Sequence, residues 1–284
     1  MSDILEVRGL IKRYDSFTLN NVAFSLPSGY IMGFIGPNGA GKSTTIKLIL
    51  NIIKRDSGNV VLFGRESTEI QNEQIGIVMD EHLYVDDWTI EDVERAVSSF
   101  YEQWDKKKFV DLLKQFGLDP KKRVKELSHG MQVKLQIAVA LSHNAMLLIL
   151  DEPTSGLDPA ARDEICDLLR EFVGDENKSV LFSTHITSDL EKVADYITLI
   201  QNGNIIFTGT KDALLAKFVR VTGGLEDASS EQKKFIIGYR EHRTGFEGMI
   251  ERSNIDKLPR NILTEEINLD EIIIFMSKGE KTNE

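Results

Sequence analysis

The feature that most constrains this chain is a glycine-rich loop between an apolar run and a helical pattern. The run Tyr30–Ile35 predicts a buried strand, and apolar residues at helical spacing predict a helix that begins near Lys42. Between them lies a match to the pattern G-x-x-x-x-G-K-[ST], formed by Gly36, Pro37, Asn38, Gly39, Ala40, Gly41, Lys42, Ser43 and Thr44. Strands that alternate with helices along the chain predict an α/β fold with a mostly parallel sheet.

The residue types of this loop indicate a site for ATP and Mg²⁺. Glycines let backbone N–H groups converge on a phosphate, and the N-terminus of the following helix favours an anion. Lys42 is expected to reach the β- and γ-phosphates, and Ser43 to ligate Mg²⁺. A turn that binds nothing is the alternative, and the flanking strand and helix argue against it.

A second apolar strand ends in two carboxylates. Met146–Leu150 is followed directly by Asp151 and Glu152. Ligands of parallel sheets lie at the carboxyl ends of the strands. Asp151 is therefore expected to face the Mg²⁺, and Glu152 to face the γ-phosphate and polarise the attacking water. Taken alone, the pattern also fits a strand that ends in a solvated turn, since Pro153 follows.

With both motifs present, residues 4–210 resemble the ATP-binding cassette (ABC) ATPase family. Four further pieces match that family in order: an aromatic that stacks on adenine at Tyr14, the signature motif at Leu127–Met131, the D-loop at Ser155–Asp158, and the switch histidine at His185. Taken alone, His185 also fits an ordinary loop histidine, and Tyr14 a packed strand aromatic. In the family, the switch histidine bonds the γ-phosphate and the catalytic glutamate.

The resemblance implies a particular fold and assembly. The fold is a phosphate-loop NTPase cassette over residues 1–210, with a mixed sheet core, an antiparallel β subdomain and a helical subdomain at about 80–142. Residues 211–284 are expected to form a small C-terminal α/β appendage. Ser128 and Gly130 begin a second anion-binding helix, which in this family meets the ATP of the other protomer. Asp158 of the D-loop is also expected to bind the nucleotide. A head-to-tail homodimer, or a pair with a homologous ATPase, is therefore expected.

The chain departs from the family pattern at three positions. Asp80, followed by Glu81, stands where the family has a glutamine that ligates the metal. A carboxylate can ligate Mg²⁺ but cannot donate a hydrogen bond as an amide does. Asp80 is expected to contribute to the metal site and to catalysis, with Glu81 as the alternative metal ligand. His129 and Met131 replace a glycine and a glutamine of the signature.

Composition narrows the function classes. The formal net charge of −11 argues against a nucleic-acid partner. The short span between Lys42 and Ser128 leaves no room for the long coiled coil of chromosome ATPases. A transport ATPase is therefore the leading hypothesis, ahead of a non-transport ABC ATPase acting on DNA or ribosomes. A nucleotide-binding protein without turnover is disfavoured, because the predicted catalytic residues are all present.

The absence of a long apolar stretch predicts a cytoplasmic protein on the inner face of the cell membrane. Membrane contact is then expected only through a transmembrane permease subunit, docked near Asp80–Asp87 with Tyr84 exposed and Trp88 packed in the core. The tail at Leu269–Phe275 resembles that of bacterial exporters of antimicrobial or amphipathic peptides and lipophilic drugs. The single cysteine, Cys166, fits a buried helix position.

Overall fold

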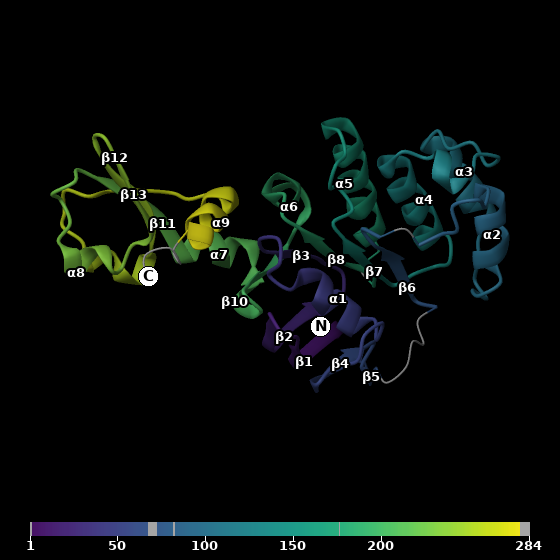
Figure 1. Ribbon diagram of the computed structural model, residues 1–284, viewed down its shortest axis with the longest axis horizontal. Helices are drawn as coiled ribbons and strands as arrows, with labels where there is room; N and C mark the ends of the chain where they lie inside the picture. The colour runs from purple at the N-terminus through teal and green to yellow at the C-terminus, as the bar shows by residue number, and fades with distance from the viewer. Residues whose placement is uncertain (1, 68–72, 82, 176, 279–284) are drawn as a thin grey trace. The chain divides into compact units, whose positions relative to one another are not determined.

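The computed structural model describes residues 2–67, 73–81, 83–175 and 177–278 (Figure 1). The chain divides into two compact units, Met1–Thr208 and Gly209–Glu284. Each unit has its own apolar core.

A six-stranded sheet forms the centre of the first unit. Its strand order is β10-β9-β3-β8-β7-β6. Strands β3, β8, β7 and β6 pair in parallel, as do β3 and β9, while the turn at Asn202–Gly203 joins β9 to β10. The parallel strands are buried on both faces, which explains their continuous apolar runs. The bounds are β3 (Ile31–Ile35), β6 (Ile75–Val78), β7 (Leu147–Asp151), β8 (Ser179–Thr184), β9 (Tyr196–Gln201) and β10 (Asn204–Thr210).

A second, antiparallel sheet has the order β2-β1-β4-β5. It consists of β1 (Asp3–Arg13), β2 (Thr18–Pro27), β4 (Ser57–Leu62) and β5 (Arg65–Glu66). The alternation of apolar and polar residues over positions 4–27 predicts two turns, at Arg8–Gly9 and at Asp15–Ser16, and the second is present. The turn expected at Arg8–Gly9 is wrong: β1 continues through it, with an irregular register between Val7 and Leu10. Pairing with strands on both sides holds β1 in line, so the irregularity bends the strand without reversing it.

Helix α1 packs into the core that joins these two sheets. Its buried residues Ile46, Leu48 and Ile49 belong to the same apolar cluster as side chains from β1, β2, β3 and β7. The phosphate loop lies between β3, which is fully buried, and α1, whose buried face belongs to this core. The helices of the first unit are α1 (Lys42–Ile49), α2 (Ile90–Ser98), α3 (Lys106–Gln115), η1 (Val124–Glu126), α4 (His129–Leu141), α5 (Pro159–Val173) and α6 (Thr187–Val193).

The prediction that Trp88 packs in the core is wrong. Trp88 is 38% exposed, because α2 begins two residues later and buries Ile90 and Val93 instead. Thr89 caps that helix through a capping box with Asp92. Tyr84, expected to be exposed, is half-buried.

The second unit contains an antiparallel sheet of order β12-β13-β11-β14. Helix α9 contacts β12 and β13. Apolar side chains such as Val221, Phe246 and Ile250 form its core. The elements are α7 (Lys211–Lys217), β11 (Phe218–Gly223), α8 (Ser230–Lys233), β12 (Ile237–His242), β13 (Gly245–Glu251), η2 (Arg252–Lys257), β14 (Leu263–Glu265) and α9 (Leu269–Lys278).

Candidate nucleotide-binding site

The phosphate loop is shaped by close backbone contacts that only glycine permits. A Cβ at Gly36 would lie 2.2 Å from the carbonyl oxygen of Ile200. Gly41 has a φ of 110°, and it precedes the first residue of α1. The backbone N–H of Gly203, in the β9–β10 turn, donates to the carbonyl of Ala40 at 3.0 Å. The loop is thus anchored by the neighbouring hairpin as well as by its own strand and helix.

The N-terminus of α1 fits a phosphate. Gly41 caps it without a side-chain hydrogen bond, and its first turn carries no acidic residue. Backbone N–H groups at such a helix start need an outside acceptor, and the helix dipole favours an anion there. Ser43 is exposed on this turn, which leaves its hydroxyl accessible to a metal ion held by phosphate oxygens.

Lys42 lies in a buried hydrogen-bonding group beside the loop. The side chain is 5% exposed and donates from Nζ to the carbonyls of Gly36, at 2.8 Å, and Pro37, at 3.3 Å. Its Nζ is also 3.2 Å from Oε1 of Glu152. A buried ammonium requires such a partner, because desolvation penalises the charged form.

The other carboxylate oxygen of Glu152 binds His185. Oε2 lies 2.8 Å from Nδ1 of His185 and accepts its backbone N–H at 3.3 Å. Donation from Nδ1 requires the proton on that nitrogen, which leaves Nε2 as the acceptor of the neutral ring. Glu152 adopts a left-handed φ of 51°, uncommon outside glycine and a frequent feature of functional sites. The structure therefore brings together Lys42, Glu152 and His185, which lie far apart in the sequence.

Asp151 is buried at the end of β7, next to a hydroxyl that the sequence analysis missed. Ser183, its register partner on β8, donates from Oγ to Oδ1 of Asp151 at 2.7 Å. The same residue accepts the backbone N–H of Glu152 at 3.0 Å. Ser183 orients both residues of the carboxylate pair. In the sequence, Ser183 is marked by its place directly after the apolar run Val180–Phe182 of β8.

Tyr14 lies in the turn after β1, with an exposed ring. Its backbone N–H donates to Phe17 at 2.8 Å, and Lys12 Nζ is 5.7 Å from the ring centroid. The tip of the Phe17 ring would be 2.9 Å from a Cβ placed on Gly41. The turn that carries Tyr14 is therefore adjacent to the phosphate loop, and its exposed ring is accessible to a nucleobase.

The start of α4 contacts the 155–158 turn of the same chain. Ser128 caps α4 by accepting the N–H of Met131 at 3.3 Å. Nε2 of His129 is 3.2 Å from the carbonyl of Ser155, and a Cβ on Gly130 would lie 2.8 Å from Leu157 Cδ2. His129, which stands where the family's signature motif has a glycine, thus makes a contact that glycine cannot make.

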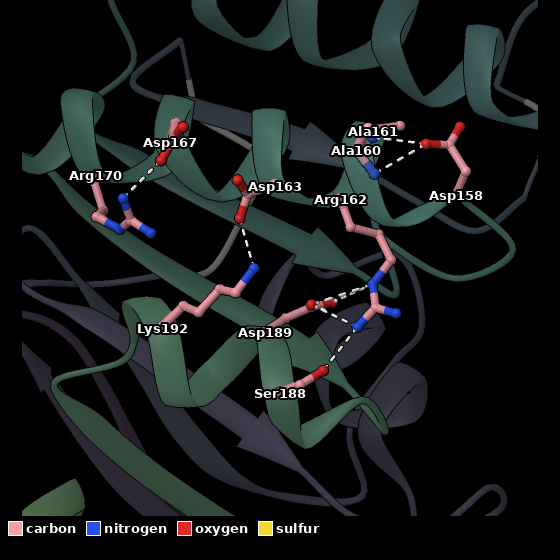
Figure 2. A network of polar contacts seen from close by, with 10 residues as sticks. All are labelled: Asp158, Ala160, Ala161, Arg162, Asp163, Asp167, Arg170, Ser188, Asp189 and Lys192. Carbon is pink, nitrogen blue, oxygen red and sulfur yellow. Dashed lines mark hydrogen bonds and ion pairs between the residues drawn. The ribbon is translucent and has the colours of Figure 1, made fainter.

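Asp158 is engaged as a helix cap. Its Oδ1 accepts the backbone N–H groups of Ala160 and Ala161, both at 3.0 Å, and these bonds lower the pKa of the carboxyl (Figure 2). At the end of β6, Asp80 is exposed, while Glu81 pairs with Lys47 of α1 at 2.6 Å. That ion pair raises the pKa of Lys47.

A polar network joins the helix after Asp158 to the helix after His185 (Figure 2). Arg162 of α5 donates to both oxygens of buried Asp189 on α6, at 2.6 to 3.2 Å, and to Ser188 Oγ at 2.9 Å. Lys192 and Asp163 pair across the same two helices at 2.5 Å. None of these pairs is predictable from the sequence, because the two members of each pair lie on separate helices.

Among the described residues, no group of three or more His, Cys, Asp or Glu side chains is arranged to hold a metal by itself. Mg²⁺ in nucleotide sites typically takes one or two protein ligands and completes its shell with phosphate oxygens and water. Fold and site together define a phosphate-loop nucleotide hydrolase with a helical subdomain inserted before its carboxylate strand.

Comparison with known proteins identifies the family. Residues 19–155 match the family model described as ABC transporter. The lantibiotic transport ATP-binding protein SrtF of Streptococcus pyogenes is 35% identical over 206 residues, covering 72% of this chain and 89% of the relative. The bacitracin transport ATP-binding protein BcrA of Bacillus licheniformis is 32% identical over 248 residues, covering 85% and 80%.

A solved structure, described as the ATP binding subunit of an ABC transporter, has a TM-score of 0.67 at 28% identity and covers 74% of this chain and 91% of that chain. The chain therefore belongs to the ATP-binding subunits of ABC transporters, which hydrolyse ATP to drive transport. The predicted cassette fold and transport ATPase class are confirmed, and the DNA- or ribosome-acting alternative is not favoured. In the part of the chain that the structure describes, no helix has the length and apolar character to cross a membrane.

Proposed function

We propose that this subunit pairs head to tail, with a second copy or a homologue, and drives export of an amphipathic peptide through a separate transmembrane permease. The observation that carries the proposal is the presence of two helix N-termini suited to phosphate on one chain, those of α1 and α4. The relatives named for lantibiotic and bacitracin transport support an amphipathic peptide as cargo.

Each residue of the α1 site has a proposed role. Lys42 holds the β- and γ-phosphates of ATP, and the exposed ring of Tyr14 stacks on the adenine. Ser43, Asp151 and Asp80 hold Mg²⁺, directly or through water, and the ion supplies neutralisation of the phosphate charge.

Glu152 is placed to orient and polarise the attacking water. Its contacts with Lys42 and His185 hold the carboxylate at the mouth of the loop. When phosphates recruit Lys42, the carboxylate loses that partner and becomes available to a water proton. His185 keeps it oriented and, with a proton on Nε2 as well as on Nδ1, donates a hydrogen bond to the terminal phosphate.

Ser128 and Gly130 are proposed to act on the nucleotide of the other protomer. The α4 start provides a hydroxyl and backbone N–H groups for that purpose. The contacts of His129 and Gly130 with the 155–157 turn connect this helix start to Asp158, whose capping role stiffens the turn. A single cassette per chain then requires a partner cassette for a complete site.

The permease is proposed to dock on a groove of about 720 Å³ in the first unit. Its lining includes Leu50, Ile77, Tyr101 and Met146, and at its rim Phe100 is 76% exposed. Leu83 and Val85 of the nearby 83–88 segment are also exposed apolar residues. The rest of the lining is polar, with Glu73, Gln74, Gln103, His143 and Asn144, and a groove that offers both apolar and polar side chains suits an amphipathic helix of a partner protein. Contact with the inner face of the membrane would then come only through the permease.

Glu152→Gln tests the paired mechanism. The amide keeps the shape and can still accept from His185, but it cannot take a proton from water and removes one negative charge beside the phosphates. We expect ATP and Mg²⁺ to trap a dimer on size-exclusion chromatography, while Lys42→Ala stays monomeric because it no longer binds ATP. A Glu152→Gln protein that remains monomeric while ATP is bound would contradict the paired site.

Phe100→Asp tests the docking surface. A carboxylate at this exposed position should leave the ATPase rate of the free subunit unchanged and prevent copurification with the transmembrane permease when the two are coexpressed. Ile206→Asp, on the exposed face of β10, is the matched control and should copurify normally. Equal copurification of both variants would place the permease elsewhere.

A further inference from the structure

Gln136 is a buried amide in a helix whose other buried positions are apolar. It lies in α4 and is 4% exposed, between Leu135 and Ile137. Burying an amide is unfavourable unless its donor and acceptor are both satisfied. An apolar side chain would fill such a position without that requirement, so the hydrogen bonds of Gln136 need an explanation of their own.

Both hydrogen bonds of the amide go to the backbone of one residue. The N–H of Met79 donates to Oε1 of Gln136 at 2.8 Å, and Nε2 donates to the carbonyl of Met79 at 3.1 Å. Met79 directly follows β6, the edge strand of the six-stranded sheet, and directly precedes Asp80. The amide therefore replaces the pairing that a further strand would provide.

A second contact, one helical turn along, keeps α4 close against β6. A Cβ on Gly76 would lie 2.8 Å from the carbonyl oxygen of Ala140. Residues 136 and 140 lie on the same face of α4, since four residues make about one turn. Helix α4 is thus held to β6 at two points, one of them the residue before Asp80.

The segment Met79–Glu81 also contacts α1. Glu81 pairs with Lys47 of α1 at 2.6 Å. Met79–Glu81 therefore connects to α4 through Gln136 and to α1 through Lys47, with Asp80 between the two anchors. These are the two helices whose N-termini are suited to phosphate.

We propose that Gln136 is a positioning residue for Asp80. Its amide fixes the peptide before Asp80 to α4, so a shift of the Ser128 end of the helix moves Asp80 as well. When the α4 start of one protomer binds the nucleotide held by its partner, the position of Asp80 in the first protomer's own α1 site therefore changes as well. This inference rests on the proposed function, because it gives Asp80 a role at the Mg²⁺ of the α1 site.

Gln136→Met is the direct test, since methionine has a similar length and helix propensity but makes neither bond. We expect the full-length subunit to retain its KM for ATP within about twofold, while kcat falls roughly 10- to 100-fold, as misplacement of a catalytic group predicts. The Mg²⁺ concentration for half-maximal activity should rise several-fold. Gln115→Met, at an exposed position of α3, is the matched control and should change none of these values.

A double variant separates positioning from general loosening. In an Asp80→Ala background, Gln136→Met should reduce kcat by less than about twofold, because the group that it positions is gone. Independent, multiplicative losses would overturn the proposal, as would an unchanged Mg²⁺ requirement in a folded Gln136→Met protein.

If Gln136→Met does not fold, Gln136→Glu decides the question. A glutamate can still accept from the Met79 N–H but, when ionised, repels the Met79 carbonyl. We expect the same rise in the Mg²⁺ requirement, and wild-type Mg²⁺ dependence would overturn the proposal. A different result would contradict the proposed function itself: a Lys42→Ala protein that still hydrolyses ATP.

Discussion

At the scale of single residues, three buried polar groups near the site are tied to specific long-range partners. Lys42 is paired with Glu152, Asp151 accepts from Ser183, and Gln136 bonds the Met79 backbone. A nucleotide site needs charges that are held in place yet can change partners when phosphate arrives. The contacts of Glu152 have this character, because one of its two oxygens binds a lysine that phosphate also attracts.

His143 gives a prediction about pH and stability. Burial lowers the pKa of its imidazole below the ordinary 6.5, while Nδ1 lies 2.9 Å from the carbonyl of Glu73 and the ring stacks on Tyr101 at 3.9 Å. Above pH 6.5 the ring is neutral in both the folded and the unfolded chain. As pH falls below that value, the unfolded chain binds the proton more readily, so the free energy of unfolding declines.

His143→Phe should remove this pH dependence while keeping the stacked ring. At pH 8 we expect the variant to be less stable by about 0.5–1.5 kcal/mol, the usual loss for one hydrogen bond. Urea unfolding at pH 8 and pH 5 should show the difference from wild type narrowing in acid. If the difference in the free energy of unfolding between wild type and His143→Phe is the same at pH 8 and pH 5, His143 is not a buried, neutral imidazole.

At the scale of elements, α5 and α6 form a connected pair. Arg162 and Asp189 join the helix that Asp158 begins to the helix that follows His185 (Figure 2). A change at the 155–158 turn can therefore reach His185 through packed helices. The neighbouring pair of Arg170 and Asp167 lies within α5 and on its exposed face, so it contributes nothing to this connection.

Asp189→Asn should reveal the strength of the link. Removing the charge leaves Arg162 without its carboxylate partner. Because the Arg162 side chain is 22% exposed, the free energy of unfolding should fall by less than for a fully buried ion pair, by about 1–3 kcal/mol. Asp167→Asn is the matched control and should cost less than about 0.5 kcal/mol. Urea unfolding measures both, and similar losses for the two would refute a special role for the Arg162–Asp189 pair.

At the scale of the whole molecule, the two units have separate cores. The first is built on α1 and two sheets, and the second on a four-stranded antiparallel sheet with its own buried residues, such as Val221 and Phe246. A unit with its own core can in principle fold by itself.

A chain that ends after Thr210 should therefore remain folded. This truncation keeps β10 complete, and with it the hairpin that anchors the phosphate loop. We expect cooperative unfolding and an ATP affinity within about twofold of the full chain, measured by calorimetry. Loss of ATP binding in a folded truncation would show that the second unit contributes to the site.

The sequence by itself determined the phosphate loop, the strand before it, the carboxylate pair and the order of the family motifs. These features depend on neighbouring residues: glycines where the backbone turns, apolar runs where strands are buried, and a lysine at a helix start. The cassette class followed from their order alone. The irregular path of β1 through Arg8 and Gly9 did not, because strands on both sides hold it straight.

Only the tertiary structure decided which side chains meet. Ser183 reaches Asp151 because β7 and β8 are adjacent in register, and Gln136 reaches Met79 because α4 packs closely against β6. In both pairs the partners are distant in the sequence, and nothing in the local pattern distinguishes them from other polar residues. Local patterns encode backbone geometry, whereas pairing between distant polar groups depends on the packing that places them together.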